Sequence, residues 1–240
     1  MNLAASAWEF RYRFWIFGAI FWISFYISHF SRTIFAQDCA VALSTVTRLP
    51  LTNNLVRAFL FVGVALSAMA AMLRTWATAY MRPEVMVDGA LHTHVVVAAG
   101  PYRHVRNPLY LGTNILAVGY SLMASRAGAA MMILCIFVYH YRIILREERG
   151  LSAAQGENYD EYRRAVPRLW PSLRPRVAAS GLKPDWRGGL LGETFFWGLA
   201  VAYLVLALTL SWRAYFLALG LTFGVYFLSL GLIGAWRRRA

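Results

Sequence analysis

The stretch NPLYLGTNILAVGYSLMASRAGAAMMILCIFVYHY, residues 107–141, contains one charged side chain, Arg126, which divides it into two apolar runs. A helix that crosses a membrane needs about 20 mainly apolar residues. The runs Asn107–Ser125 and Ala127–Tyr141 therefore predict two consecutive membrane-spanning helices, and the second is expected to continue to Arg149.

The rest of the chain has a similar composition. Of its 240 residues, 59% are hydrophobic and 15% are charged, whereas soluble chains carry about 25% charged residues. Four further apolar runs are present. The first of them, Phe14–Ser31, is expected to be a membrane anchor rather than a removed signal, because no clear cleavage site follows it. The sequence thus predicts an all-α, polytopic membrane protein with about six transmembrane helices. The further runs are Phe14–Ser31, Ala58–Leu73, Thr194–Trp212 and Ala214–Trp236.

The positive charges predict an orientation. If the N-terminus is cytoplasmic and six helices alternate, 19 of the 24 Lys and Arg residues fall on the cytoplasmic side. Cytoplasmic loops carry such an excess. We expect a multi-pass protein of a bacterial inner membrane, or of the endoplasmic reticulum in a eukaryote, with both termini cytoplasmic. The net charge is +13, but nearly all Lys and Arg residues flank apolar runs, as in membrane proteins. Nucleic acid is therefore not expected as a partner. The opposite side holds Arg32, Arg48, Arg57, Arg126 and Arg213.

Two polar segments, about Met81–Arg106 and Glu147–Gly189, fall on the same predicted side. The motif GPYRHVRNPLYLG, residues 100–112, extends from the first of them into a helix start. Gly-Pro favours a tight turn and Pro108 a first helical position. Backbone N–H groups there can hold a carboxylate with help from Arg106, while Tyr102 and Tyr110 offer faces to an adenine or a sulfonium. The alternative is an interfacial turn with aromatic and Arg anchors.

A second motif, RIILREERGL at residues 142–151, ends the fourth predicted helix. Arg142 and Arg146 are four residues apart and share a helix face. His140, Ile144, Glu147 and Leu151 form a neighbouring stripe. Charged groups at membrane depth usually face a protein interior or a polar cavity. A charged helix end on the surface is the alternative.

A third motif, GENYDEYRRAVPRLWP, spans residues 156–171. Tyr159, Tyr162 and Val166 fit one helical face, and the helix is expected to end at Val166 because a residue before proline avoids helical geometry. The segment either folds back over a cofactor as a lid or meets lipid phosphates. The cations for the second interpretation are Arg163, Arg164 and Arg168.

These motifs, in this order and with an Arg74-x-Trp76-Ala77 stretch before them, resemble the isoprenylcysteine carboxyl methyltransferase and phospholipid methyltransferase superfamily. The resemblance covers roughly residues 74–171. It implies a hairpin of the third and fourth helices, with a cofactor pocket at their cytoplasmic ends. It also implies S-adenosylmethionine as methyl donor and a lipophilic acceptor: an isoprenylcysteine carboxylate, a phospholipid amine or another small lipophilic nucleophile.

The resemblance also implies a set of site residues. On this basis we predict that Arg106 binds the donor carboxylate or Arg146 the acceptor, and that Glu147 and Glu148 bind donor amino or ribose groups, so the predicted catalytic set is Arg106, Arg146 and Glu147. The family often has Arg-His-Pro where this chain has Arg106-Asn107-Pro108, and Asn cannot titrate as His does. The implied cofactor contacts are Gly100, Pro101, Tyr102, His104, Arg106, Pro108, Tyr110, Glu147 and Glu148.

The expected division of the chain is residues 1–73 for two N-terminal helices, 74–175 for the methyltransferase core and 176–240 for a linker and two additional helices that serve packing or oligomerisation. Membrane lipids are expected partners, and the oligomeric state stays open. Cys39 and Cys135 have no metal-ligand spacing, so no metal site is expected.

Other function classes remain open. Membrane NADPH-dependent sterol or steroid reductases have a similar Arg-x-Pro/Asn-x-Tyr-x-Gly pattern. They commonly carry an acidic residue directly after that glycine, whereas Thr113 and Asn114 follow Gly112 here. A non-catalytic lipid-binding protein could share the fold. A transporter is less favoured, because no internal repeat is found.

Overall fold

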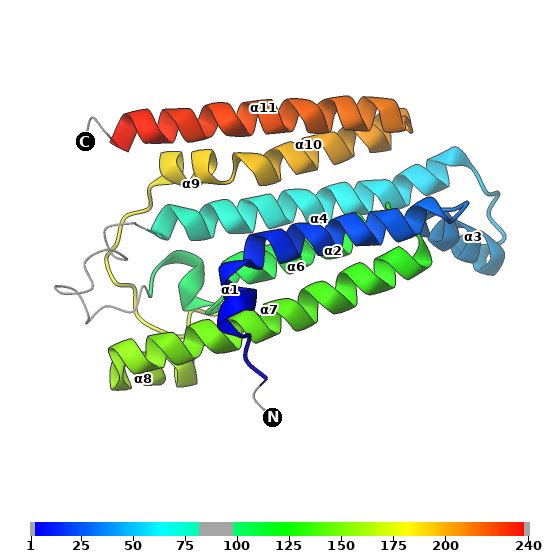
Figure 1. The fold of residues 1–240 in the computed structure, drawn as a ribbon. Helices are drawn as coiled ribbons and strands as arrows, with labels where there is room; N and C mark the ends of the chain where they lie inside the picture. The colour runs from blue at the N-terminus through cyan, green and yellow to red at the C-terminus, as the bar shows by residue number, and fades with distance from the viewer. Residues whose placement is uncertain (1–2, 82–97, 238–240) are drawn as a thin grey trace.

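The computed structural model describes residues 3–81 and 98–237, and all regular structure in these residues is helical (Figure 1). The all-α prediction is confirmed for this part of the chain. The elements are α1 (Ala7–Arg11), α2 (Arg13–His29), α3 (Phe35–Thr47), α4 (Asn53–Tyr80), the 3-10 helix η1 (Gly100–Arg103), α6 (Pro108–Ser121), α7 (Arg126–Gln155), α8 (Glu157–Ala165), α9 (Trp186–Gly192), α10 (Thr194–Thr209) and α11 (Trp212–Arg237).

Each of the six predicted runs forms a helix, namely α2, α4, α6, α7, α10 and α11. The sequence did not predict α1, α3 or α9. The polar Gln37 and Asp38 interrupt the apolar pattern of α3, and α9 contains two adjacent glycines. Tertiary contact explains α9: a Cβ on Gly189 would lie 2.8 Å from the Thr75 carbonyl of α4, so glycine lets the two helices touch.

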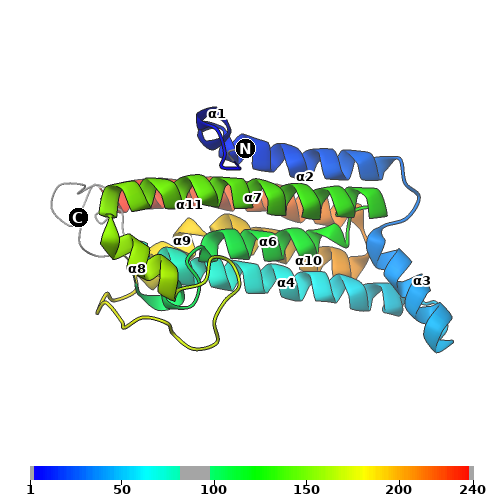
Figure 2. The ribbon, with the colours of Figure 1, turned by 90° about the horizontal axis from the view of Figure 1, so that it is seen from below.

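The long helices lie side by side with nearly parallel axes (Figures 1 and 2). In both views η1, α8 and α9 gather at one end of this bundle and α3 lies at the other. The described parts of the two polar segments, Met81–Arg106 and Glu147–Gly189, therefore share one end of the molecule. Residues 82–97 of the first segment, with Arg82, lie outside the described residues.

Helices α6 and α7 form the hairpin that the resemblance implied (Figure 1). The Ser125 hydroxyl caps α7 by accepting the N–H of Gly128 at 3.2 Å. The start of α3 holds the turn, because the N–H of Phe35 donates to the Ala124 carbonyl at 2.6 Å. The turn end of the hairpin is thus fixed, and its other end carries the sequence motifs.

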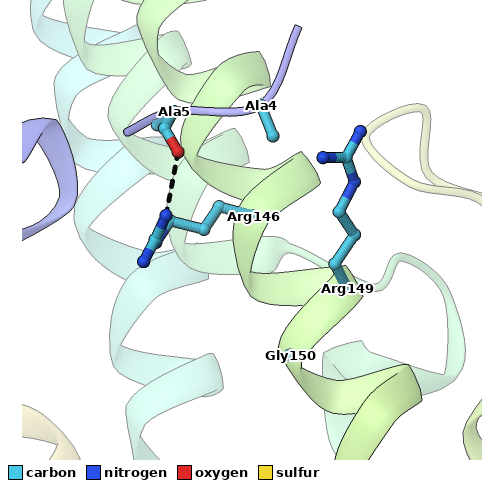
Figure 3. A pocket seen from close by; sticks show the side chains of 5 residues that line it. All are labelled: Ala4, Ala5, Arg146, Arg149 and Gly150. Atoms are coloured by element: carbon cyan, nitrogen blue, oxygen red, sulfur yellow. Dashed lines mark hydrogen bonds between the residues drawn. The ribbon is translucent and has the colours of Figure 1, made fainter. Parts of the chain in front are cut away.

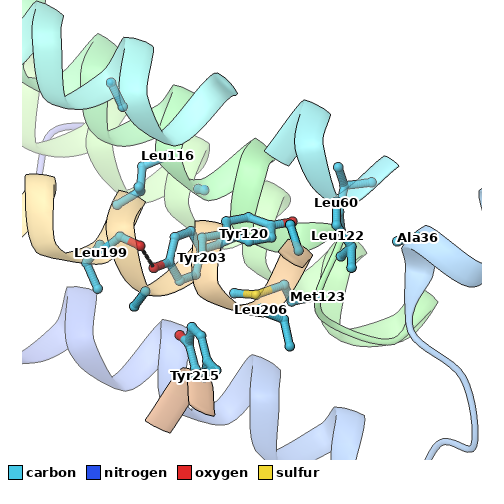
Figure 4. Close-up of a cluster of buried hydrophobic side chains, with 14 of the residues drawn as sticks. Ala36, Leu60, Leu116, Tyr120, Leu122, Met123, Leu199, Tyr203, Leu206 and Tyr215 are labelled. Atoms are coloured by element: carbon cyan, nitrogen blue, oxygen red, sulfur yellow. Dashed lines mark hydrogen bonds between the residues drawn. The ribbon is translucent and has the colours of Figure 1, made fainter. Parts of the chain in front are cut away.

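The core lies where α10 packs against α4 and α6 (Figure 4). The fully buried Tyr203 donates its hydroxyl to the Gly119 carbonyl at 3.1 Å, and Tyr120 donates to the Leu199 carbonyl at 2.9 Å. A Cβ on Gly119 would lie 2.9 Å from the Gly63 carbonyl, so α4 and α6 touch through glycine. Small residues commonly permit such close packing of helices in membranes. The C-terminal helices therefore belong to the same core as the hairpin.

Among the described residues, α4 and α7 are long and apolar enough to cross a membrane. Helices α9 and α10 would make a third span if they are one helix bent by 59°. Helices α2, α6 and α10 have 17, 14 and 16 residues, which is less than the about 20 that a straight span needs. The structure thus supports two or three spans by length and composition.

Candidate functional site

The first motif folds as its sequence predicts. Gly100 has φ +53°, a left-handed value that favours glycine, and the 3-10 helix η1 follows it. A Cβ on Gly100 would also lie 2.4 Å from the Tyr80 ring. Helix α6 begins at Pro108. The turn and the helix start together place Tyr102 and Tyr110 at the open end of the α6–α7 hairpin, opposite the turn that connects the two helices.

The third motif folds back onto the first. Helix α8 ends at Ala165, and Val166 is extended before Pro167, as predicted. Tyr162 packs with Tyr159 and Val166 in a small cluster and donates its hydroxyl to the Tyr102 carbonyl at 2.8 Å.

Further backbone contacts extend this pairing along the chain. The N–H of Arg106 donates to the Pro167 carbonyl at 2.9 Å, and the N–H of Ser172 donates to the His104 carbonyl at 2.9 Å. The His104 ring Nδ1 lies 2.8 Å from the Ser172 carbonyl. The segment after α8 therefore covers the loop that precedes α6, and His104 helps to hold it there.

Glu148 is the centre of a buried charge network. Its carboxylate receives Arg106 on one oxygen at 3.0 Å and Arg168 on the other at 2.8 Å, and it is 3% exposed. Asn107, which stands where the family often has His, donates its amide to Glu148 at 3.2 Å and to the Arg168 carbonyl at 3.2 Å. Nε and Nη2 of Arg106 donate to Glu148, and Nη1 donates to the Arg163 carbonyl. Each of the three guanidinium nitrogens of Arg106 therefore has a protein acceptor. The network joins three parts of the chain: the loop directly before α6, helix α7 and the segment after α8.

Glu147, the adjacent residue on α7, has a different environment. The Tyr110 hydroxyl donates to its carboxylate at 2.9 Å. Glu147 is mostly buried, and no Lys, Arg or His among the described residues forms an ion pair with it; Arg13 acts on its charge from beyond ion-pair distance. A buried carboxylate without a cation is costly. Glu147 is therefore open to a cationic ligand, whereas Glu148 is saturated by protein groups.

The Tyr102 hydroxyl is a second polar group without a partner. It is fully buried and makes no hydrogen bond with the described residues. Burial raises the pKa of Tyr102, and the charged groups that act on it are Arg74, Glu193 and Glu147. The phenol therefore stays protonated and can donate a hydrogen bond. Buried polar groups nearly always have a partner, so this hydroxyl is suited to a ligand.

Glu193, which is outside the expected site set, forms a buried ion pair with Arg74 at 2.6 Å. The available signal was a lone acidic residue directly before the apolar run that starts at Thr194. Arg168, likewise outside the expected site set, reaches Glu148 from the third motif. Within the described residues no group of three or more His, Cys, Asp or Glu is placed to hold a metal.

Arg146 lies on another face of α7 from the Glu148 network. Its Nη1 donates to the Ala5 carbonyl at 3.1 Å, and with Arg149 and Ala4 it lines a pocket of about 360 Å³ (Figure 3). One turn earlier, Arg142 pairs with Glu9 at 2.9 Å. The structure thus places the Arg142–Arg146 face against the N-terminal segment, whose Ala5 packs in the same apolar cluster as Tyr110.

This N-terminal attachment should be sensitive to acid. The hydrogen bond from Arg142 lowers the pKa of Glu9 from 4.5 to about 2. A carboxyl whose pKa is lowered by folding stabilises the fold above its unfolded pKa, and this contribution is lost as the pH falls through the folded value. We expect hydrogen exchange of residues 4–12, corrected for its intrinsic pH dependence, to rise between about pH 4.5 and pH 2. Glu9→Gln should exchange fast throughout, and wild-type protection that is constant over this range would contradict the prediction.

The predicted site residues thus divide into groups. Tyr102, Tyr110 and Glu147 present polar atoms that are free or bound only to one another. Arg106, His104 and Glu148 are engaged in protein contacts. Gly100, Pro101 and Pro108 shape the turn and the start of α6. Arg146 contacts the N-terminal segment instead.

Two known proteins are similar to part of this chain. The chain is 29% identical over 116 residues to the nickel-cobalt-cadmium resistance protein NccN of Alcaligenes xylosoxydans xylosoxydans, which covers 48% of this chain and 51% of that protein. It is 31% identical over 75 residues to the protein-S-isoprenylcysteine O-methyltransferase of Schizosaccharomyces pombe, which covers 31% of this chain and 32% of that protein. The alignments span about half of the first relative and about a third of the second. No solved structure matches the chain significantly.

The family comparison covers the hairpin and its motifs. Residues 58–158, from the second turn of α4 to the start of α8, match the phospholipid methyltransferase family. This range includes Tyr102, Arg106, Tyr110, Glu147 and Glu148. Over residues 58–158, the chain is therefore similar to the phospholipid methyltransferase family.

Proposed function

We propose that the protein is an integral membrane methyltransferase that transfers a methyl group from S-adenosylmethionine to a lipophilic acceptor. The observation that carries this proposal is a pair of groups at the end of the hairpin: among the described residues, the Glu147 carboxylate has no ion-pair partner and the Tyr102 hydroxyl has no hydrogen-bond partner. Both lie within the segment that matches the methyltransferase family.

The residues fit a cationic donor. S-adenosylmethionine, when bound, supplies a methyl group on a sulfonium that leaves as a neutral thioether. Glu147 would bind the positive charge of the donor, and the Tyr102 and Tyr110 rings would lie beside it. The first N–H groups of α6 would hold the donor carboxylate. Arg106 and Glu148 would then fix the loop that carries Tyr102 rather than bind the donor directly.

The protein's remaining task is orientation and exclusion of water. The segment after α8 covers the loop before α6, and the Glu148 network holds this cover closed. Alignment of reacting groups can supply roughly 7–11 kcal/mol in favourable cases. A carboxylate acceptor needs no base. An amine acceptor must lose a proton to a base.

The proposed membrane arrangement has six spans, in α2, α4, α6, α7, the α9–α10 pair and α11, with both termini and the site at the cytoplasmic face. The apolar exterior supports this arrangement: Trp15 on α2 is 79% exposed, and Leu217 and Leu221 on α11 are each 72% exposed. Such faces suit lipid. An amphiphilic acceptor would enter from the bilayer and the donor from the cytoplasm. A bacterial inner membrane is the proposed location.

The first test compares ligands on the purified protein. S-adenosylhomocysteine should raise the melting temperature, because a ligand that binds only the folded state stabilises it, and NADPH should not. Stabilisation by NADPH alone would favour the membrane reductase, and stabilisation by neither would favour a non-catalytic lipid-binding protein. Membranes incubated with labelled S-adenosylmethionine should then yield labelled lipid, which mass spectrometry of the lipid fraction would identify.

A further inference from the structure

The C-terminal helices contribute a buried charge to the end of the hairpin where the proposed site lies. Glu193 occupies the break between α9 and α10, outside the matched residues 58–158, and is 4% exposed. It binds Arg74 of α4 through both carboxylate oxygens, at 2.6 and 3.1 Å, and accepts the Thr78 hydroxyl at 2.7 Å. The chain therefore places a fully engaged carboxylate at a bend in an apolar helix pair.

Arg74 transmits this contact to α6. Its Nη1 donates to the Leu109 carbonyl at 3.1 Å and to the Thr113 hydroxyl at 2.8 Å, both in the first two turns of α6. The fit is close, since a Cβ on Gly112 would lie 2.6 Å from Cγ of Arg74. The guanidinium also stacks on the Phe196 ring at 3.8 Å. Arg74 thus joins α4, α6 and α10 through one side chain.

The first turn of α6 is the part that carries the proposed site. Leu109 directly precedes Tyr110, whose hydroxyl binds Glu147. Arg74 and Glu193 are also among the charged groups that act on the Tyr102 hydroxyl. Removing one partner of a buried ion pair leaves an uncompensated charge that must find a new partner. A change at Glu193 would therefore disturb the positions of both Tyr110 and Tyr102.

We propose that Glu193 is a positioning residue for the donor site: through Arg74 it fixes the first turn of α6, and so aligns Tyr110 with Glu147. The proposal rests on the proposed methyltransferase function. It assigns the C-terminal helix pair to the site rather than to packing alone.

The test compares Glu193→Gln with Tyr203→Phe in the full-length protein. Tyr203 lies on α10, the helix that follows Glu193, and binds α6 at Gly119, away from the site. Three quantities are measured: the affinity for S-adenosylhomocysteine, the melting temperature and hydrogen exchange of residues 109–114. We expect Glu193→Gln to weaken binding on the order of tenfold and to speed exchange in this turn. Tyr203→Phe should lower the melting temperature while both other quantities stay at their wild-type values.

Glu193→Asp keeps the charge and should recover part of the affinity. If Glu193→Gln does not fold, Thr78→Val removes one hydrogen bond from Glu193 and should produce a smaller change in the same direction. Wild-type affinity and exchange in Glu193→Gln, or in Thr78→Val, would overturn the proposal. A wild-type protein that does not bind S-adenosylhomocysteine would refute the proposed function, whereas hydrogen exchange would still decide the positioning role.

Discussion

Glu147→Gln should bind S-adenosylhomocysteine roughly 10- to 150-fold more weakly than the wild type, the equivalent of a charge-assisted hydrogen bond of about 1.5–3 kcal/mol. The reason is that Glu147 is mostly buried, accepts the Tyr110 hydroxyl at 2.9 Å and forms no ion pair with a described residue, while Arg13 acts on its charge only from beyond ion-pair distance. The ligand must then supply the positive charge. Gln keeps the shape and can still accept the hydrogen bond from Tyr110, so the loss of affinity reports the charge itself.

The stability of the same variant should not fall. Replacing a buried carboxylate that lacks a cation removes a desolvation penalty, so the melting temperature of the ligand-free protein should equal or exceed that of the wild type. Isothermal titration and thermal denaturation in the same detergent would measure the two effects. Glu161→Gln, an exposed change of the same charge on α8, is the matched control. Wild-type affinity in Glu147→Gln would remove Glu147 from the donor site.

Glu148→Ala should instead destabilise the fold strongly. It leaves Arg106, whose side chain is 7% exposed, and Arg168, which is 30% exposed, without their shared carboxylate. Loss of one partner of a buried pair costs about 3–5 kcal/mol, and the partial exposure of Arg168 places the expected value near about 3 kcal/mol. For a chain of this size the melting temperature should fall by roughly 6–12 °C.

The control for this prediction is Arg168→Gln. This change leaves Glu148 paired with Arg106 at 3.0 Å, so it should cost less than Glu148→Ala. Thermal denaturation of the ligand-free variants would measure both. If Glu148→Ala were as stable as the wild type but lost ligand affinity, then Glu148 would be a ligand residue and its network would not hold the segment after α8.

Several features could be predicted because they depend on residues close together in the chain. The apolar runs give the helices, the Gly100-Pro101 step gives the turn, and the Val166-Pro167 step ends α8. The resemblance added the hairpin. The sequence missed α9, which is short and glycine-rich, because its stability comes from contact with α4 and not from its own pattern.

The sequence by itself therefore determined the helical character, the order of the apolar helices and the motifs that meet at one end of the hairpin. Only the tertiary structure decided that Glu148 is saturated while its neighbour Glu147 is open, and that Arg146 faces the N-terminal segment. The physical reason is distance along the chain. Arg106 and Glu148 are 42 residues apart, and Arg74 and Glu193 are 119 apart. Helix packing determines which partner a buried charge contacts, and a local sequence pattern does not predict it.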